Sequence, residues 1–217
     1  MRKIEPSFER YNPDIKAVIW DNMDVLSFTV GGSYLDLWVR RLGVTEAEAL
    51  RVLTSPESDL LDLGEMSKED YFDYVLRELK LPEEKRAALE LSRENFTYDR
   101  ELHGYIGEMR SHFTTVLLSV MPLYAQEFVR ETWPEFERVF DHVIISSEVH
   151  LNKPDPRIFH LALGRVGCKP QEAVFIDDRR RNVEAARELG IQGVLYESRE
   201  QVLGELEKIL RKPAAGS

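Results

Sequence analysis

Short apolar runs alternate with helical patterns over much of the chain. Four such runs each precede a polar residue, and a weaker fifth follows; they span residues 17–20, 114–118, 142–145, 173–176 and 193–196. Their length and β-branched content are typical of buried parallel strands. Helical patterns cover 156–166, with Gly167 as the stop, and 180–189, with Gly190 as the stop. This alternation predicts an α/β fold with right-handed crossovers.

Residues 31–98 follow a different pattern, with no strand-like run and with apolar residues at helical spacing. Thr45 and Glu48 have the spacing of a capping box, and Ser67 with the acidic residues after it is a similar start signal. We therefore predict an all-helical insert after the first strand. Ligands of open α/β sheets bind beyond the carboxyl ends of the strands, so the insert could be a lid there or simply an extra structural subdomain.

Polar residues at the ends of the predicted strands are the candidates for chemistry. They are Asp21, Ser119, Lys153 in the loop after the third run, and the adjacent Asp177 and Asp178. In a parallel sheet these ends open on the same edge, so carboxylates, a hydroxyl and an ammonium would converge. Facing carboxylates need a cation between them, and hard oxygen ligands suit Mg²⁺. A hydroxyl and an ammonium can hold a phosphate, which a nearby carboxylate can attack to form an acyl-phosphate. Singly, Asp21 also suits a strand-end cap and Ser119 a turn.

Charge and composition restrict the partners. The 217 residues include 29 Lys+Arg and 39 Asp+Glu, which gives a formal net charge of -10. Nucleic acids and anionic membranes are polyanions, so we expect neither as a partner. No apolar run approaches the ~18 residues of a membrane span, and the first residues lack the apolar stretch of a signal peptide. A single cysteine, Cys168, excludes an internal disulfide and a multi-cysteine metal site. We expect a cytoplasmic monomer or homodimer that acts on a small molecule.

Four segments at these strand ends carry a recognisable order. They are Trp20-Asp21-Asn22-Met23-Asp24-Val25-Leu26, then Leu117-Leu118-Ser119, then residues 146–159, then residues 174–178 continuing to 190. Together they resemble the motifs of the haloacid dehalogenase (HAD) superfamily, in its phosphatase-like branch, and the likeness runs from about residue 15 to about residue 200. Residues 63–67 resemble the lid of that branch. The resemblance implies a Rossmann-like parallel sheet core, residues 1–30 and 99–217, and a helical cap, residues 31–98, inserted after strand 1.

The resemblance also implies an activity, a Mg²⁺-dependent hydrolysis of phosphomonoesters through an aspartyl-phosphate. Asp21 would be the nucleophile and a Mg²⁺ ligand, and Ser119 and Lys153 would bind the phosphate. Asp178, with Asp177 beside it, would hold the metal. Asp155 and Asn182 would shape a turn and a helix start.

Four positions depart from the family pattern. Met23 and Asp24 stand where the family has an acidic second residue or a Gly-Gly or Gly-Asn pair. Val120 replaces a common Asn, and His150 replaces a common Gly. Met23 cannot protonate a leaving alcohol, which predicts impaired phosphatase activity.

Three explanations for these departures remain open. The chain is a divergent phosphatase, or a relative that keeps the fold with little activity, or a protein whose pocket was rebuilt by nature or by an engineer; the Gly216-Ser217 end agrees with engineering. In a rebuilt pocket without need of Mg²⁺, His150 would act as base or nucleophile, oriented by Asp24, in proton abstraction or ester cleavage. A 2-haloacid dehalogenase is a further alternative, which the Asp177-Asp178 pair disfavours.

Overall fold

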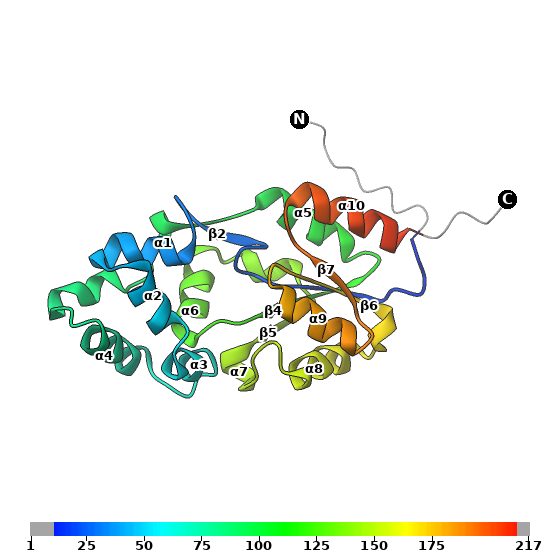
Figure 1. Cartoon of the computed structure of the whole chain (residues 1–217). Helices are drawn as coiled ribbons and strands as arrows, with labels where there is room; N and C mark the ends of the chain where they lie inside the picture. Colours follow the sequence, from blue (N-terminus) through cyan, green and yellow to red (C-terminus); the bar gives the residue numbers. More distant parts are fainter. Residues whose placement is uncertain (1–10, 212–217) are drawn as a thin grey trace.

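The computed structural model describes residues 11–211. The first ten residues and residues 212–217 lie outside the described part, and with them the expectations about a signal segment and the Gly-Ser end. Five strands form one parallel sheet in the order β5-β4-β1-β6-β7 (Figure 1). They are β1 (Ala17–Trp20), β4 (Thr114–Ser119), β5 (His142–Ile145), β6 (Ala173–Asp177) and β7 (Gln192–Leu195). Each matches a predicted run to within one residue at either end, so the predicted α/β fold is confirmed.

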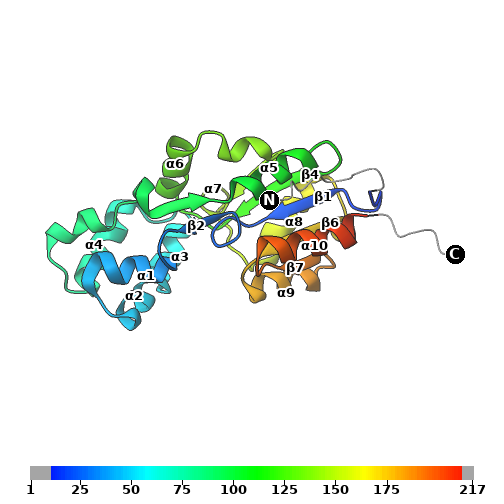
Figure 2. The ribbon, with the colours of Figure 1, turned by 90° about the horizontal axis from the view of Figure 1, so that it is seen from above.

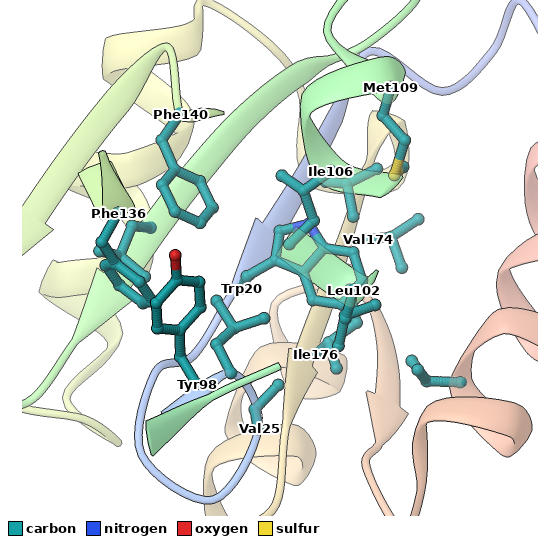
Figure 3. Packing of buried hydrophobic residues seen from close by; sticks show 14 of the residues in the cluster. Trp20, Val25, Tyr98, Leu102, Ile106, Met109, Phe136, Phe140, Val174 and Ile176 are labelled. Carbon is teal, nitrogen blue, oxygen red and sulfur yellow. The ribbon is translucent and has the colours of Figure 1, made fainter. Parts of the chain in front are cut away.

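Helices cover both faces of this sheet. One face packs on α5 (Arg100–Met109) and α10 (Arg199–Leu210), and the other on α8 (Pro156–Val166) and α9 (Arg180–Glu188) (Figures 1 and 2). Side chains alternate between the faces along each strand, as the pleat requires. In β1, Val18 and Trp20 therefore belong to the cluster under α5 and α10, and Figure 3 shows Trp20 packed there. As predicted, α8 ends at Gly167, which has the left-handed φ of 74° typical of a helix stop.

The segment between β1 and β4 is mostly helical. Its elements are α1 (Tyr34–Trp38), a π-helical turn (Val39–Gly43), α2 (Glu46–Leu53), α3 (Pro56–Asp62), α4 (Lys68–Glu78) and 3-10 turns at Glu83–Ala88 and Arg93–Asn95. The predicted start signals are confirmed, because the hydroxyl groups of Thr45 and Ser67 accept hydrogen bonds from Glu48 N and Asp70 N. We call residues 31–95 the helical insert; it has its own apolar core around Trp38, Phe72 and Val75.

A small antiparallel ribbon joins the insert to the sheet domain. β2 (Ser27–Thr29) pairs with β3 (Phe96–Tyr98), so the chain leaves and re-enters the insert side by side. The prediction that residues 31–98 are helical throughout is therefore wrong at Phe96–Tyr98. Three residues are too short to produce a clear alternating pattern, and their pairing partner lies far away in the sequence.

The remaining elements complete the loops at the edges of the sheet. They are α6 (Leu123–Thr132), α7 (Ser146–Val149) and 3-10 turns at Phe136–Val139 and Pro170–Glu172. α3 of the insert contacts α7, which follows directly after β5 (Figure 1). This contact confirms that the insert lies at the carboxyl edge of the sheet. No helix within residues 11–211 combines the length and the apolar character needed to span a bilayer.

Candidate active site at the carboxyl edge of the sheet

Two of the predicted carboxylates meet at the buried ammonium group of a third predicted residue, Lys153. Asp21 follows β1, and Asp177 is the last residue of β6, so the central strands deliver both carboxylates to one edge. Lys153, from the loop between α7 and α8, places Nζ 2.6 Å from Asp21 Oδ1 and 2.6 Å from Asp177 Oδ2. Exposure is 7% for Asp21, 0% for Asp177 and 4% for Lys153, so solvent screens this charge cluster little.

Asp177 is held by hydrogen bonds besides the one from Lys153. Its carboxylate accepts from the backbone N–H of Arg179 at 2.8 Å and from Asn182 Nδ2 at 3.0 Å on each oxygen. Asn182 is 2% exposed and lies in the first turn of α9. Asn182 was expected to have a structural role, and in the structure it fixes the orientation of the Asp177 carboxylate.

Asp178 completes a group of three carboxylates. One ligand oxygen from each of Asp21, Asp177 and Asp178 lies within 4.8 Å of the others. Burial raises the pKa of Asp21 to about 6, although the charge of Lys153 opposes this. Burial, followed by the charge of Asp177, also raises the pKa of Asp178. Three carboxylates thus lie together while Lys153 supplies one positive charge, and three hard oxygen donors at this spacing fit a cation such as Mg²⁺.

Ser119 reaches the same edge from the neighbouring strand. It ends β4, which pairs with β1 through Leu117 and Trp20, and its residue is 1% exposed. Met23, one of the departures from the family pattern, is half-buried and packs on the main apolar cluster. Met121 is buried in that cluster. The structure thus brings Asp21, Lys153, Asp177 and Asp178 together and places Ser119 one strand away.

Asp24 and His150 are not brought together. The Asp24 carboxyl is half-buried, and burial raises its pKa while Arg179 lowers it. His150 is exposed, and its Nδ1 lies 2.8 Å from the carbonyl oxygen of Leu63 in the insert. Among residues 11–211 no hydrogen bond joins the two side chains, so the expected His150–Asp24 pair is absent here. The pair does not form because the His150 imidazole is directed toward the backbone carbonyl of Leu63 in the insert.

Backbone conformation explains why these two positions differ from the family pattern. Asp24 has φ of 63° and His150 has φ of 53°, both in the left-handed region. The family pattern has glycine or asparagine at the position of Asp24 and glycine at that of His150. These residue types adopt a left-handed backbone at least cost. The two departures thus change side chains at turns whose backbone shape is kept.

The insert is fastened to the sheet edge beside this site. Ser146 Oγ donates to the backbone carbonyl of Asp62 at 2.6 Å and accepts from Met121 N at 2.9 Å. A Cβ atom on Gly64, whose φ is 70°, would lie 2.5 Å from the carbonyl oxygen of Ser147. The chain thus approaches α7 so closely that only glycine fits. The sequence analysis did not identify this contact: Ser146 enters it only as the first residue of the segment 146–159, Gly64 only within the lid-like residues 63–67, and Asp62 not at all.

The comparisons with known proteins agree with this geometry. A family model described as haloacid dehalogenase-like hydrolase matches residues 118–196. The chain is 30% identical over 159 residues to a phosphorylated carbohydrates phosphatase of Thermotoga maritima. The aligned region covers 73% of this chain and 67% of that protein. The chain belongs to the haloacid dehalogenase-like hydrolase family. The resemblance drawn from the four motifs is therefore confirmed.

Other similar proteins match over a shorter part of the chain or at lower sequence identity. Over 80 residues, or 37% of this chain, it is 40% identical to acyl-CoA dehydrogenase family member 10 of Mus musculus, and it spans only 8% of that protein. A HAD family enzyme of Bacteroides thetaiotaomicron, solved in complex with magnesium and inorganic phosphate, superimposes with a TM-score of 0.70 at 20% identity. That match covers 87% of this chain and 98% of the other, and it supports the shared fold.

Proposed function

We propose that this HAD-family hydrolase cleaves phosphomonoesters of small molecules, with Asp21 as the nucleophile. The observation that carries the proposal is the Lys153 ammonium bridging the buried carboxylates of Asp21 and Asp177, with Asp178 beside them. A site with this much buried negative charge and one fixed cation is suited to a metal ion and an anionic substrate.

Mg²⁺ fits the donors present. Asp21, Asp177 and Asp178 offer carboxylate oxygens within 4.8 Å of one another, and Lys153 supplies a single positive charge to Asp21 and Asp177. Bound there, Mg²⁺ would neutralise the phosphate and keep Asp21 ionised.

The residues of the chain would perform the covalent steps. A carboxylate oxygen of Asp21 attacks phosphorus, the bond from phosphorus to the ester oxygen breaks, and the alcohol leaves with a proton from solvent. Water then attacks the aspartyl-phosphate, which releases inorganic phosphate, returns the Asp21 carboxylate and gives a proton to solvent. Lys153 and Ser119 would hold the oxygens of the phosphate, and Asn182 would keep Asp177 turned toward Lys153.

The leaving group decides how fast the first step runs. Met23 stands at the place of the second acidic residue and offers no proton. An aryl phosphate, whose phenolate leaves without protonation, should therefore suffer less than an alkyl phosphate. The name of the Thermotoga maritima relative supports a small phosphorylated substrate.

The test measures hydrolysis of 4-nitrophenyl phosphate with Mg²⁺ and with EDTA. The wild-type chain should require Mg²⁺, and Asp21→Asn should lose at least about a thousandfold in kcat because an amide is a poor nucleophile. Asp14→Asn, at an exposed position away from the site, is the matched control and should keep full activity. Turnover by Asp21→Asn, or full turnover in EDTA, would reject the proposal.

A further inference from the structure

The end of α3 in the insert is capped by side chains from the sheet domain. The backbone carbonyls of Asp62 and Leu63 lie where a helix leaves its carbonyl groups without intrahelical partners. Neither accepts a backbone hydrogen bond within residues 11–211. Instead, Ser146 Oγ donates to Asp62 O at 2.6 Å, and Nδ1 of His150 lies 2.8 Å from Leu63 O. Because a carbonyl oxygen only accepts, Nδ1 of His150 carries a proton and donates.

These two bonds hold α7 at both of its ends. Ser146 is the first residue of α7, and His150 follows Val149, its last residue. A helix of four residues has little stability of its own, so its position depends on such contacts. Between the two bonds, Gly64 approaches the carbonyl oxygen of Ser147 so closely that no Cβ atom fits. The end of α3 and the whole of α7 therefore form one packed unit, and Figure 1 shows them side by side.

His150 adopts a backbone conformation that suits glycine better. Its φ of 53° and ψ of 36° are left-handed, which a residue with a Cβ atom adopts only at a cost. The imidazole is exposed, so burial of the ring does not offset this cost. The bond to Leu63 O is the one hydrogen bond of the imidazole within the described residues. What histidine adds over glycine at this position is therefore the bond to the insert.

The same segment leads directly to the buried ammonium group. Lys153 lies three residues beyond His150, so at most ~10 Å of extended chain separates them. The Lys153 side chain is 1% exposed, and Nζ lies 2.6 Å from both Asp21 Oδ1 and Asp177 Oδ2. At such short distances, a small displacement of the loop after α7 changes both contacts. The position of the insert thus bears on the geometry around Lys153.

Ser146 links the insert to the strand end that carries Ser119 as well. Its hydroxyl is buried and accepts a hydrogen bond from Met121 N at 2.9 Å, two residues beyond Ser119. One hydroxyl group thus joins the end of α3, the loop after β4 and the start of α7. This buried bond fixes one end of α7, and the exposed bond of His150 fixes the end next to Lys153.

We propose that His150 is a positioning residue, which ties the insert to the loop of Lys153 and so holds the ammonium group between its two carboxylates. This inference rests on the proposed phosphatase function and adds to it a residue that acts through Lys153. The histidine that replaces the common glycine of the family thereby strengthens the docking of the insert, and it does not serve as a base.

The test compares His150→Gly with His150→Asn. Glycine relieves the left-handed backbone and removes the bond to Leu63 O. Asparagine tolerates the same φ and carries an N–H donor on Nδ2, as many bonds from Cα as Nδ1 of histidine. His150→Gly should lower kcat for 4-nitrophenyl phosphate about threefold, as expected for the loss of one exposed hydrogen bond, and should change KM less. His150→Asn should restore most of the lost kcat.

Lys80→Gly is the matched control for the change of backbone. Lys80 has the same φ of 53°, is exposed, and makes no side-chain hydrogen bond or ion pair within residues 11–211. This variant should keep the wild-type kcat. Thermal unfolding checks that all three variants fold. An unchanged kcat in His150→Gly, or an equal loss in His150→Asn, would overturn the inference.

Hydrogen exchange followed by mass spectrometry separates this inference from the proposed function, because it needs no turnover. In His150→Gly, peptides containing residues 56–66 and 151–155 should both exchange about threefold faster, since the bond between the two segments is lost. His150→Asn and Lys80→Gly should stay near the wild type. This result supports the tie even if 4-nitrophenyl phosphate is not hydrolysed.

Two other outcomes of the exchange measurement would count against His150. Faster exchange in residues 56–66 alone would make His150 a local cap of α3 and overturn its role toward Lys153. Unchanged exchange in both segments, with hydrolysis of 4-nitrophenyl phosphate intact, would reject the tie and leave the proposed function standing.

Discussion

Lys153 and Asp21 are separated by 132 positions in the sequence, and their side chains meet with Nζ 2.6 Å from Oδ1. Asp177 shares the same ammonium, also at 2.6 Å. Breaking such a buried ion pair from one side is strongly destabilising, because the partner charge remains buried without compensation. The pair therefore links the stability of the sheet edge to the chemistry proposed for it.

Replacing Lys153 by Met should show this link. We expect Lys153→Met to lower the free energy of unfolding by about 3 kcal/mol at pH 7, since two buried carboxylates lose their cation. Mg²⁺ should restore part of the loss by supplying positive charge. Urea unfolding with and without Mg²⁺ measures both effects. Lys16→Met, which breaks the pair of Lys16 with Glu172, should cost much less, because solvent screens that surface pair. Similar losses for the two variants would contradict this account.

Gly64→Ala should weaken the docking of the insert on α7. The new Cβ atom would lie 2.5 Å from the carbonyl oxygen of Ser147, so the turn must move. Gly167→Ala is a close control, because its φ of 74° is similar and nothing lies within 4 Å of its new Cβ. Both variants carry the left-handed cost of about 1 kcal/mol, and we expect Gly64→Ala to lose a further ~1–3 kcal/mol from overpacking. Equal free energies of unfolding for the two variants would contradict this prediction, because they would show that the turn moves away from Ser147 at little cost.

The pH dependence of stability should report the Asp62 carboxyl. Burial, with the nearby charge of Asp59, raises its pKa from 3.8 to about 7, against the opposing charge of Arg179. The folded state therefore holds the Asp62 proton more tightly than the unfolded chain, and the free energy of unfolding falls as pH rises from about 4 to about 7. Asp62→Asn should remove this decline. The free energy of unfolding of the variant, measured relative to that of the wild type, should therefore be higher at pH 8 than at pH 4 by at least about 1 kcal/mol.

Asp36 provides a control of opposite sign for Asp62→Asn. Hydrogen bonds from Ser33 lower the pKa of Asp36, so its contribution to stability is present above pH 3.8 and is lost as pH falls. Asp36→Asn should therefore be less stable than wild type at pH 8, and the difference should shrink in acid. Urea unfolding at pH 2.5, 4, 6 and 8 measures both variants, with the Asp36 effect expected between pH 4 and pH 2.5. A pH-independent difference for Asp62→Asn would contradict the buried-carboxyl account.

Local sequence signals identified most of the fold. The five strands were visible because buried parallel strands are continuous apolar runs, and Thr45, Ser67 and Gly167 marked helix ends by their capping chemistry. β3 at Phe96–Tyr98 was missed because its only support is a partner strand far away in the chain. A pattern within one segment carries no information about such pairing.

The site was predictable where residue type and strand order decide it. Asp21, Lys153, Asp177 and Asp178 converge because parallel strands end at one edge. The position of His150 could not be derived, because the group that bonds to it is the backbone carbonyl of Leu63, 87 residues away. Every residue has a backbone carbonyl, so the sequence does not reveal which one a distant side chain will bond. The same applies to the hydrogen bond from Ser146 to the backbone carbonyl of Asp62.

The central claim, that Asp21 forms an aspartyl-phosphate, is tested most directly by trapping that intermediate. Protein quenched in acid during turnover of 4-nitrophenyl phosphate with Mg²⁺ would be digested and mapped by mass spectrometry. The account predicts a phosphoryl group on the peptide that contains Asp21, and none on that peptide from Asp21→Asn. Phosphoryl transfer to another residue, or steady turnover by Asp21→Asn, would contradict it.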